Sequence, residues 1–378
     1  MTRRYRMTFL MQQVLGHRTH SAALAKSVMA DAEIDPLWVP ITYHREDGWI
    51  ERAPGLPAGV KGVARAATEV HRALAAAPAD VILFNSPALA TTAGARIARI
   101  PAVISLDVTP RQFDREGRHF GHRADTGSMA DLKHRWNRRL FSRVAAFAPW
   151  SHWAAHSLVD DYGVERSRIH VIPPGVDIAA WTGPERADSV RPRVLFVGTD
   201  FIRKGGDLVV GWYRSRGHTL CELHIVSADP RARAAAGDGV VVHADLTPDD
   251  DRLRRLYWSS DVYVMPSRSE PFGIAAIEAL AAALPVVASS VGGLADIVDH
   301  EASGILVEPE NVGDLDVALT RLLSSTSLRN QMSRAAREAA QGRYDASVNN
   351  RRLIDLLKAS VVKRAARVSP LAGEVVAR

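Results

Sequence analysis

Short apolar runs alternate with amphipathic stretches along the whole chain of 378 residues. In the first half, the runs expected to form strands are 5–11, 37–43, 80–86, 102–107 and 145–151. Apolar residues at helical spacing mark the segments between them, among them 63–77, 90–100 and 131–144. Apolar strands separated by helices are typical of parallel sheets that helices cover on both faces. The pattern therefore predicts an α/β fold.

Proline, glycine and charged residues interrupt the pattern at 181–192, which we interpret as a linker. A second series of expected strands follows at 193–199, 222–227, 240–245, 261–267, 285–290 and 304–309. We predict an N-terminal Rossmann-like domain over 1–175, a C-terminal Rossmann-like domain over 176–358, and a tail at 359–378 that packs back on the first domain. Doubly wound sheets of this kind bind ligands at the carboxyl ends of their strands, so a cleft between the domains is expected.

Two glutamates stand in the otherwise apolar segment SEPFGIAAIEALAAALPVVAS, which covers residues 269–289. Glu270 follows an expected strand and precedes Pro271, a residue type favoured at the first position of a helix. The next backbone amides, those of Phe272, Gly273 and Ile274, would then lack partners within the helix and point together at a ligand. The alternative for Glu270 is an ordinary acidic residue at a helix start.

Glu278 lies about two turns further along the same expected helix, where no basic side chain is within reach. A buried carboxylate needs a partner, and a ribose diol would supply two hydroxyl donors to one carboxylate. An exposed position or a structural ion pair is the alternative for this residue.

A second candidate element, FVGTDFIRKGG, runs from an expected strand through Gly198 and Thr199 to Arg203 and Lys204. Two adjacent cations at a glycine-rich turn between a strand and a helix favour binding of a diphosphate, with a basic surface turn as the alternative. The segment lacks both the GxGxxG and the GxxxxGK[ST] pattern, so neither a dinucleotide fold nor a P-loop is indicated.

These motifs resemble, in order along the chain, those of the retaining GT-B glycosyltransferases of the large group-one family, of the family-four type. The residues that carry the resemblance are IPPGVD, FVG with RKGG, MPSRSEPFGIAAIEALAAALPVVASSVGGLADIV and GILVEPENVGDL. The match is strong in the second half of the chain, whereas the first half agrees mainly in layout.

The resemblance implies a donor site in the second domain. Glu270 would contact the donor sugar, the amides of 272–274 would hold sugar or phosphate oxygens, and Glu278 would bind the ribose. Arg203 and Lys204 would neutralise the diphosphate leaving group, so neither a metal nor another cofactor is expected. Many relatives carry an arginine directly after the glycine of FVG; here that position is Thr199, and we expect Arg203 to supply the charge.

In the first domain the resemblance points to two further places. Relatives often have a histidine before an aspartate at one strand end, where this chain has Leu106 and Asp107. Asp107 is expected to face the donor sugar or the acceptor, with an ordinary strand-end aspartate as the alternative. The loop QVLGHRTHS supplies Gly16, His17 and Thr19 as candidates near the donor phosphates and the acceptor, although Thr19 also suits a helix cap.

The implied reaction moves a hexose from a nucleotide-diphosphate sugar to a hydroxyl of a saccharide or lipid-linked acceptor, as in cell-envelope polysaccharide or glycolipid biosynthesis. Two alternatives stay open at this point. The first is a catalytically silent protein that binds nucleotide sugars, which the departures at Thr199 and Leu106 motivate. The second is a sugar-nucleotide epimerase or a phosphorylase, since one fold hosts several reactions.

Charge is concentrated in one region of the chain. The net charge is +6, and the segment 111–143 holds nine Lys or Arg against four Asp or Glu. This segment suits a peripheral contact with an anionic membrane or a phosphorylated substrate, whereas a solvated helical face is the alternative. Nucleic acid is disfavoured because no binding module is recognisable.

The remaining signals concern location and metals. Gln12 and Gln13 interrupt the N-terminal apolar run, which favours a strand over an export signal, and the lone Cys221 fits a reducing compartment. We therefore expect a cytoplasmic protein, peripheral at the inner membrane face. The acidic run 249–251 is interpreted as the start of a helix that Thr247 caps and that has Pro248 in its first turn, rather than as a metal site. His152 and His156 have metal-ligand spacing but no evident third ligand.

Overall fold

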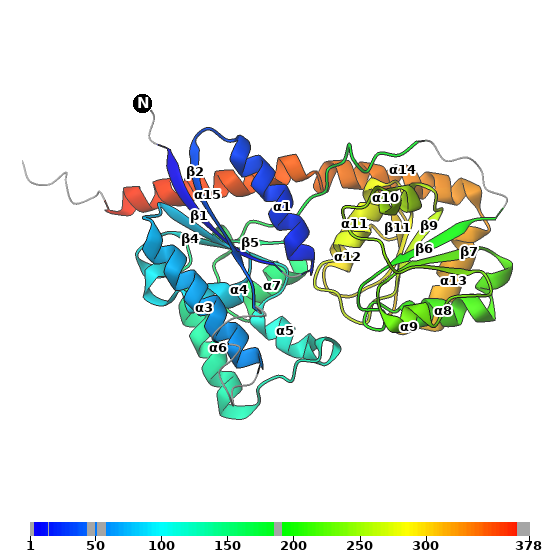
Figure 1. Cartoon of the computed structure of the whole chain (residues 1–378), viewed down its shortest axis with the longest axis horizontal. Coiled ribbons are helices and arrows are strands. Elements are labelled where there is room, and N and C mark those ends of the chain that lie inside the picture. Colours follow the sequence, from blue (N-terminus) through cyan, green and yellow to red (C-terminus); the bar gives the residue numbers. More distant parts are fainter. Residues whose placement is uncertain (1–3, 14, 44–49, 51–57, 185–190, 369–378) are drawn as a thin grey trace, which may run out of the picture. The chain divides into compact units, whose positions relative to one another are not determined.

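The computed structural model describes residues 4–13, 15–43, 50, 58–184 and 191–368. The chain divides into two compact units, each with its own sheet (Figure 1). The first unit comprises Met1–Arg115, Ala124–Pro173 and Ser347–Arg378, and the second comprises Glu116–Arg123 and Pro174–Ala346.

The first unit is built on a five-stranded sheet in the order β2-β1-β3-β4-β5, and all of its strand pairs are parallel. Its strands are β1 (Tyr5–Gln12), β2 (Ile34–Ile41), β3 (Val81–Phe84), β4 (Ala102–Leu106) and β5 (Ala146–Pro149). Its helices include α1 (Leu15–Ala30), α3 (Ala58–Ala76), α4 (Pro87–Thr92), α5 (Pro110–Glu116), α6 (Gly127–Phe141), α7 (His152–Asp160) and α15 (Ala346–Val368).

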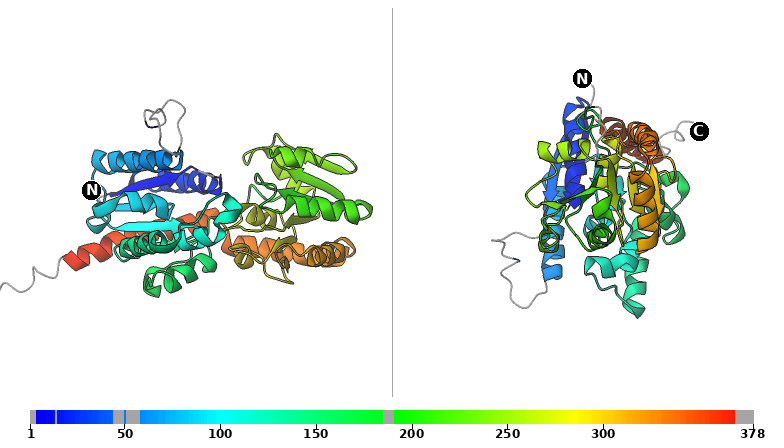
Figure 2. Two further views of the ribbon diagram at one scale, coloured as in Figure 1. Left: turned by 90° about the horizontal axis from the view of Figure 1, so that it is seen from below. Right: turned by 90° about the vertical axis from the view of Figure 1, so that its right-hand side faces the viewer.

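Both faces of this sheet are buried, because successive side chains of a strand point to opposite faces. Leu10 packs in one apolar cluster with residues of α3, α4 and α6, whereas its neighbours Phe9 and Met11 pack in another with residues of α1 and α15. Helices therefore cover the sheet on both sides, as the views in Figure 2 show.

The long C-terminal helix α15 belongs to the first unit. Its residues Leu353 and Leu357 are fully buried among side chains of β1 and α1, and Asn350 Nδ2 donates to Ala23 O at 3.1 Å. Lys358 Nζ forms ion pairs with Asp31 and Glu33 at 2.8 and 2.7 Å. The division between the units consequently lies at 346, earlier than the expected 358, because the apolar face of α15 completes this core. The last ten residues of the expected tail, 369–378, lie outside the described residues.

The second unit contains a six-stranded sheet in the order β11-β10-β9-β6-β7-β8, again with parallel pairs. Its strands are β6 (Arg193–Val197), β7 (Glu222–Val226), β8 (Val240–His243), β9 (Val262–Met265), β10 (Val286–Ser289) and β11 (Gly304–Val307). Its helices are α8 (Gly206–Ser215), α9 (Pro230–Arg233), α10 (Asp251–Trp258), α11 (Ile274–Ala281), α12 (Leu294–Ile297), α13 (Val312–Leu323) and α14 (Thr326–Arg343).

Each segment expected to be a strand overlaps one of these eleven strands, so the α/β prediction is confirmed. The expected linker is only partly open to description, since 185–190 lie outside the described residues. Its first residue, Trp181, is buried and packs edge-on against Tyr257, with ring centroids 5.0 Å apart. Among the helices that the structure describes, none combines the length and the hydropathy of a membrane span.

Candidate functional site

Two polar loops of the second unit leave the same edge of its sheet. Strands β6 and β9 are parallel neighbours, so their carboxyl ends lie side by side. The loop 198–205 follows β6 and carries Arg203 and Lys204, whereas the loop 266–273 follows β9 and carries Glu270. Residues 67 positions apart in the sequence are thereby brought together, as the carboxyl-end rule for parallel sheets predicts.

Glu270 is the centre of this cluster. Its Oε2 lies 2.9 Å from Lys204 Nζ and 3.4 Å from Arg203 Nη1, and all three side chains are largely buried. Burial alone would raise the pKa of Glu270, but the two cations outweigh it and hold the pKa of this carboxyl below its ordinary value. The buried group is therefore a carboxylate compensated by two cations, the condition under which a buried charge is tolerated.

Arg203 is fixed by several contacts at once. Its Nη1 donates to Ser269 O at 2.7 Å, its Nε donates to Asp200 Oδ2 at 3.2 Å, and its guanidinium lies over the ring of Phe120 at 4.8 Å. A planar guanidinium held on three sides has little rotational freedom left to lose when it binds an anion.

Gly198 leaves room for the lysine. A Cβ on Gly198 would lie 2.6 Å from Lys204 Cδ, so a side chain there would displace the stem of Lys204. The neighbouring Thr199 is exposed at the start of the loop. Gly198 thus leaves space for Lys204, and Thr199 is exposed to solvent.

The helix after Glu270 begins later than expected. Pro271 does not open it; α11 starts at Ile274, and Gly273 is its N-cap with φ +109°. We expected the amides of 272–274 to lie in the first turn of the helix. For Phe272 and Gly273 this was wrong, because Gly273 has a left-handed backbone conformation, which favours glycine, and the helix begins only after it. The amides of Gly273 and Ile274 nevertheless find no acceptor in the part of the chain that the structure describes.

Glu278 lies on α11 with a partner that the sequence did not indicate. Tyr257 Oη donates to Glu278 Oε2 at 3.2 Å, and the Tyr257 ring stacks on Tyr263 with centroids 5.8 Å apart. Burial raises the pKa of Glu278 to about 7, against the lowering effects of the Tyr257 hydroxyl and of Lys204. The interpretation as an exposed residue is wrong, since Glu278 is 7% exposed.

Arg268 is another residue that the sequence reasoning missed. It forms a two-pronged ion pair with Asp207 at 2.8 and 2.9 Å and a third contact with Glu310 Oε1 at 2.9 Å. Its amide donates to Arg203 O at 2.8 Å, so Arg268 ties the two polar loops together. The only signal in the sequence was its place within MPSRSEPFG, part of the longest motif that carries the resemblance.

The first unit holds a separate polar cluster at the carboxyl end of its own sheet. His17 Nε2 lies 3.4 Å from Asp107 Oδ2, and the His17 ring packs on Trp150 with centroids 4.7 Å apart. His20, one turn further along α1, is 4% exposed and also packs on Trp150. Among the described residues neither ring nitrogen of His20 has a hydrogen-bond partner, and burial lowers its pKa to about 3.

The segment QVLGHRTHS is a helix rather than a loop for most of its length. Helix α1 begins at Leu15, so Gly16, His17 and Thr19 all lie in its first two turns. Thr19 is too far inside the helix to be its N-cap. The sequence thus placed His17 and Asp107 at the correct strand ends without indicating that their side chains meet.

Helix capping explains the acidic run of the second unit. The acidic residues do stand at a helix start, but the N-cap of α10 is Asp250 and not the expected Thr247, since the Asp250 side chain accepts from Arg252 N at 2.8 Å. Within the described ranges, no three His, Cys, Asp or Glu side chains gather in a way that could hold a metal ion.

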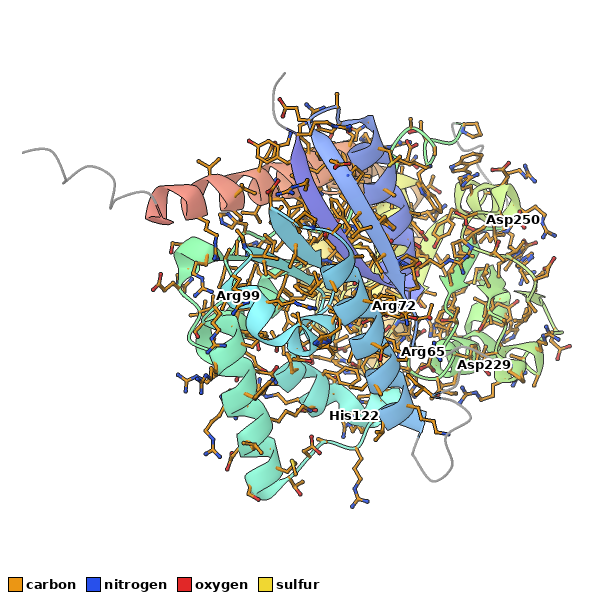
Figure 3. All side chains as sticks on the ribbon, turned by 60° about the vertical axis from the view of Figure 1, so that its left-hand side comes forward. Arg65, Arg72, Arg99, His122, Asp229 and Asp250 are labelled. Carbon is orange, nitrogen blue, oxygen red and sulfur yellow. The ribbon has the colours of Figure 1, made fainter. Side chains whose placement is uncertain are left out.

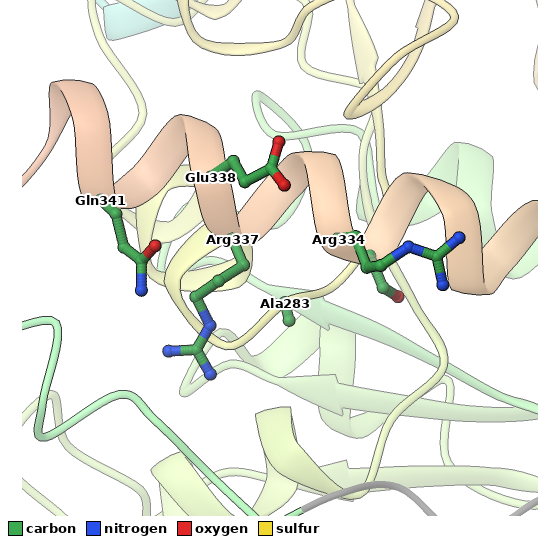
Figure 4. A pocket seen from close by; sticks show the side chains of 6 residues that line it. Ala283, Arg334, Arg337, Glu338 and Gln341 are labelled. Atoms are coloured by element: carbon green, nitrogen blue, oxygen red, sulfur yellow. The ribbon is translucent and has the colours of Figure 1, made fainter.

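A surface pocket of about 380 Å³ lies on α14 and the turn before β10 (Figure 4). Its lining includes Ala283, Arg334, Arg337 and Glu338. None of the site residues expected from the sequence lines this pocket.

Two family models match the chain. The model described as "Glycosyl transferases group 1" matches residues 180–339, and that described as "Glycosyltransferase Family 4" matches residues 13–180. The first contains every expected site residue of the second unit, and the second contains every one of the first unit.

Curated relatives are similar over about half of the chain. A D-inositol 3-phosphate glycosyltransferase from Jonesia denitrificans is 34% identical over 214 residues, which are 50% of each chain. A protein of the same name from Xylanimonas cellulosilytica is 31% identical over 241 residues, or 56% of each chain. The chain spans about half the length of the curated relatives it matches.

Solved structures share the fold over nearly the whole chain. Sucrose-phosphate synthase from Thermosynechococcus elongatus superposes with a TM-score of 0.76 at 17% identity, covering 95% of this chain and 100% of that one. Anabaena HepE in complex with UDP superposes with a TM-score of 0.66 at 17% identity, covering 94% and 100%. The two parallel sheets and this likeness confirm the GT-B architecture of two Rossmann-like domains.

Proposed function

The chain belongs to the group 1 glycosyltransferases, and from that premise we propose that it transfers a hexose from a nucleotide-diphosphate sugar to a hydroxyl group of its acceptor. The observation that carries the proposal is the buried cluster of Glu270, Lys204 and Arg203 at the carboxyl end of the second sheet. Two cations held in place at the same sheet edge as the unpartnered amides of Gly273 and Ile274 would suit the binding of a diphosphate.

In the proposed mechanism Lys204 and Arg203 act on the leaving group. The bond between the anomeric carbon and the β-phosphate oxygen breaks, and its electron pair stays on the phosphate. Cations already held in place stabilise this developing charge without reorganising, which is commonly the largest contribution to catalysis. The chain's own residues could thus supply the stabilisation that a metal ion would otherwise give.

Glu270 holds the two cations in the free protein and contacts the sugar in the donor complex. A diphosphate that binds Lys204 would loosen its ion pair with Glu270 and free lone pairs of the carboxylate for sugar hydroxyls. We assign the Glu278 carboxylate to the ribose diol, where two charge-assisted hydrogen bonds would compensate its burial. Tyr257, which now donates to Glu278, would position that carboxylate.

The acceptor hydroxyl forms the new bond to the anomeric carbon, and its proton leaves with a departing phosphate oxygen. We propose that transfer retains the anomeric configuration, with attack on the face that the phosphate leaves, as the resemblance implies. Asp107 and His17 are assigned to the acceptor, because they form the polar cluster at the ligand-binding edge of the first sheet.

The relatives' names suggest where to begin the search for substrates. UDP is bound in the HepE structure, and D-inositol 3-phosphate is named in the curated relatives, so UDP-sugars and that acceptor come first. Thermal shifts with a panel of nucleotide diphosphates and nucleotide sugars would identify the donor, since a ligand of the folded state raises its stability.

Transfer is then measured with the identified donor and an acceptor panel, with product analysis by mass spectrometry and NMR. A shift that Lys204→Ala and Glu278→Ala both abolish, together with a glycoside of retained configuration, supports the proposal. Donor binding without transfer to any acceptor would instead indicate a silent nucleotide-sugar-binding protein. Isomerised donor or phosphate-dependent cleavage would indicate an epimerase or a phosphorylase.

A further inference from the structure

Helix α6 of the first unit exposes a row of large apolar side chains. Met129, Leu132 and Trp136 are 59%, 55% and 59% exposed. Their spacing of three and four residues places them one above another on a single side of the helix. Single exposed apolar residues are ordinary, but a continuous row that includes tryptophan marks an interaction surface.

The core of the unit takes up other residues of α6. Leu140, four residues after Trp136 and so in line with the row, is buried, and Phe141, on another side of the helix, is buried as well; both pack with the apolar cluster beneath the sheet. The apolar row thus enters the core at Leu140 and lies in solvent at Met129, Leu132 and Trp136. We call the row Met129, Leu132 and Trp136 the apolar stripe.

Three arginines lie along the apolar stripe. Arg135 and Arg139 precede and follow Trp136 by one and three residues, so both fall beside the stripe on a helical projection, and Arg143 stands two residues past the end of α6 at Phe141. All three are exposed, and none forms an ion pair within the described residues. Lys133, on the core side, is by contrast paired with Asp114 at 2.8 Å.

The surface therefore combines an apolar stripe that includes a tryptophan with unpaired cations, on one helix and the turn that follows it. Helices that lie in the boundary between lipid headgroups and acyl chains have this combination, since tryptophan favours the interface and arginine binds lipid phosphates. A second copy of the chain would bring its own three arginines against these three, which electrostatic repulsion disfavours. Charge complementarity selects an anionic partner, and the apolar stripe selects one with an apolar interior.

We propose that α6 docks the protein on the surface of an anionic lipid bilayer. Met129, Leu132 and Trp136 enter the headgroup boundary, and Arg135, Arg139 and Arg143 pair with lipid phosphates. This inference concerns where the protein works and stands whether or not the assignment of the donor site is correct.

Sedimentation of the full chain with vesicles tests the proposal, without any sugar nucleotide present. Vesicles of phosphatidylcholine alone are compared with vesicles in which phosphatidylglycerol replaces part of it. The wild-type chain should bind the anionic vesicles at least about tenfold more tightly, and Arg135→Glu/Arg139→Glu should lose roughly tenfold or more, as expected for two reversed charges near a leaflet.

Matched variants distinguish the role of the α6 surface from the general effect of changing charge or apolar area anywhere on the unit. Arg72→Glu/Arg99→Glu reverses two exposed arginines elsewhere on the same unit (Figure 3) and should bind like the wild type. Trp136→Ser should weaken binding about tenfold, whereas Val63→Ser, at a position 57% exposed on α3, should not. Circular dichroism checks that each variant is folded.

Three results would overturn the proposal. The first is equal binding to both kinds of vesicle, or no binding to either. The second is a loss for Arg72→Glu/Arg99→Glu as large as that for Arg135→Glu/Arg139→Glu. The third is a dimer of the wild type that Trp136→Ser dissociates, since the stripe would then be an interface between copies of this chain.

Discussion

Two carboxylates at strand ends have very different surroundings in the two units. Glu270 in the second unit has a lysine and an arginine within 3.4 Å, and the arginine is itself held by Ser269 and Asp200. Asp107 in the first unit has an ion-pair contact with His17, behind which His20 lies buried without a hydrogen-bond partner among the described residues. In the second unit the charged side chains of the cluster are already paired with one another, whereas in the first unit the ring nitrogens of His20 have no hydrogen-bond partner among the described residues.

This difference matches the chemistry of the two proposed ligands. Every donor of a given type carries the same diphosphate and ribose, so a rigid and fully paired site can serve it. Acceptors vary in shape, and a cluster with unused hydrogen-bonding capacity can be adapted to different hydroxyl groups. The comparison predicts larger losses from changes in the second unit.

The largest effect is expected for Lys204→Ala. Removing the ammonium group from the leaving phosphate should lower kcat by about 10² to 10³, as for other groups that stabilise transition-state charge. It also leaves Glu270 buried with Arg203 alone, which should lower the free energy of unfolding by about 1–3 kcal/mol. Steady-state kinetics and chemical denaturation measure the two effects.

A second substitution separates the effect on kcat from the effect on stability. In Lys204→Ala/Glu270→Gln the buried carboxylate is replaced by a neutral amide and Arg203 keeps its ion pair with Asp200, so the free energy of unfolding should return toward that of the wild type while kcat stays low. Full activity in Lys204→Ala would mean that this lysine does not act on the leaving group.

Asp107→Asn should come next, with an effect on the acceptor only. The neutral amide keeps the shape but loses charge beside His17, so kcat/KM for the acceptor should fall about tenfold to a hundredfold, as expected for the loss of one charge-assisted hydrogen bond. Donor affinity, measured by titration calorimetry, should stay unchanged. Weakened donor binding would contradict the assignment of Asp107 to the acceptor.

Glu278 should make donor binding depend on pH. Its pKa is raised to about 7, so the free protein holds it mainly protonated below that pH and ionised above it. Because the carboxylate is the better acceptor for the ribose hydroxyls, the Kd for the donor should fall several-fold as pH rises through about 7. Glu278→Gln should bind about tenfold more weakly with this pH dependence removed, and an unaltered profile would argue against the ribose assignment.

The last effect concerns the acid stability of the first unit and leaves activity near neutral pH unchanged. The pKa of His20 is lowered to about 3 from an ordinary value of 6.5, so the unfolded chain takes up a proton before the folded one does. Its stabilising contribution is present above about 6.5 and is lost as pH falls toward about 3, by at most about 1.4 kcal/mol per pH unit. His20→Leu should flatten the acid limb of a Tm profile, whereas the exposed His156→Leu should leave it unchanged.

The sequence predicted the architecture, and it predicted that Arg203, Lys204 and Glu270 each follow a strand of the second sheet. Strand positions followed from apolar runs, whereas the meeting of these three side chains depends on β6 and β9 being neighbours, which the sequence did not indicate. The start of α11 was placed too early because Pro271 suits both a first helical turn and a tight loop, and the conformation of Gly273 decided between them.

Contacts between distant segments were beyond sequence reasoning. Tyr257 reaches Glu278 from α10, and Arg268 reaches Asp207 across the two loops, through side-chain packing that no local pattern encodes. The tail from 359 was expected on the first unit, but α15 already packs there from Ser347 onward, and its apolar spacing did not show where that contact begins.

The most direct measurement is a crystal structure of the full chain with the nucleotide diphosphate that the thermal-shift panel identifies. The account predicts diphosphate oxygens within hydrogen-bond distance of Lys204 Nζ and the Arg203 guanidinium, and ribose hydroxyls on the Glu278 carboxylate. A nucleotide bound elsewhere, with Lys204 still paired to Glu270 and Glu278 bonded to Tyr257 alone, would contradict it.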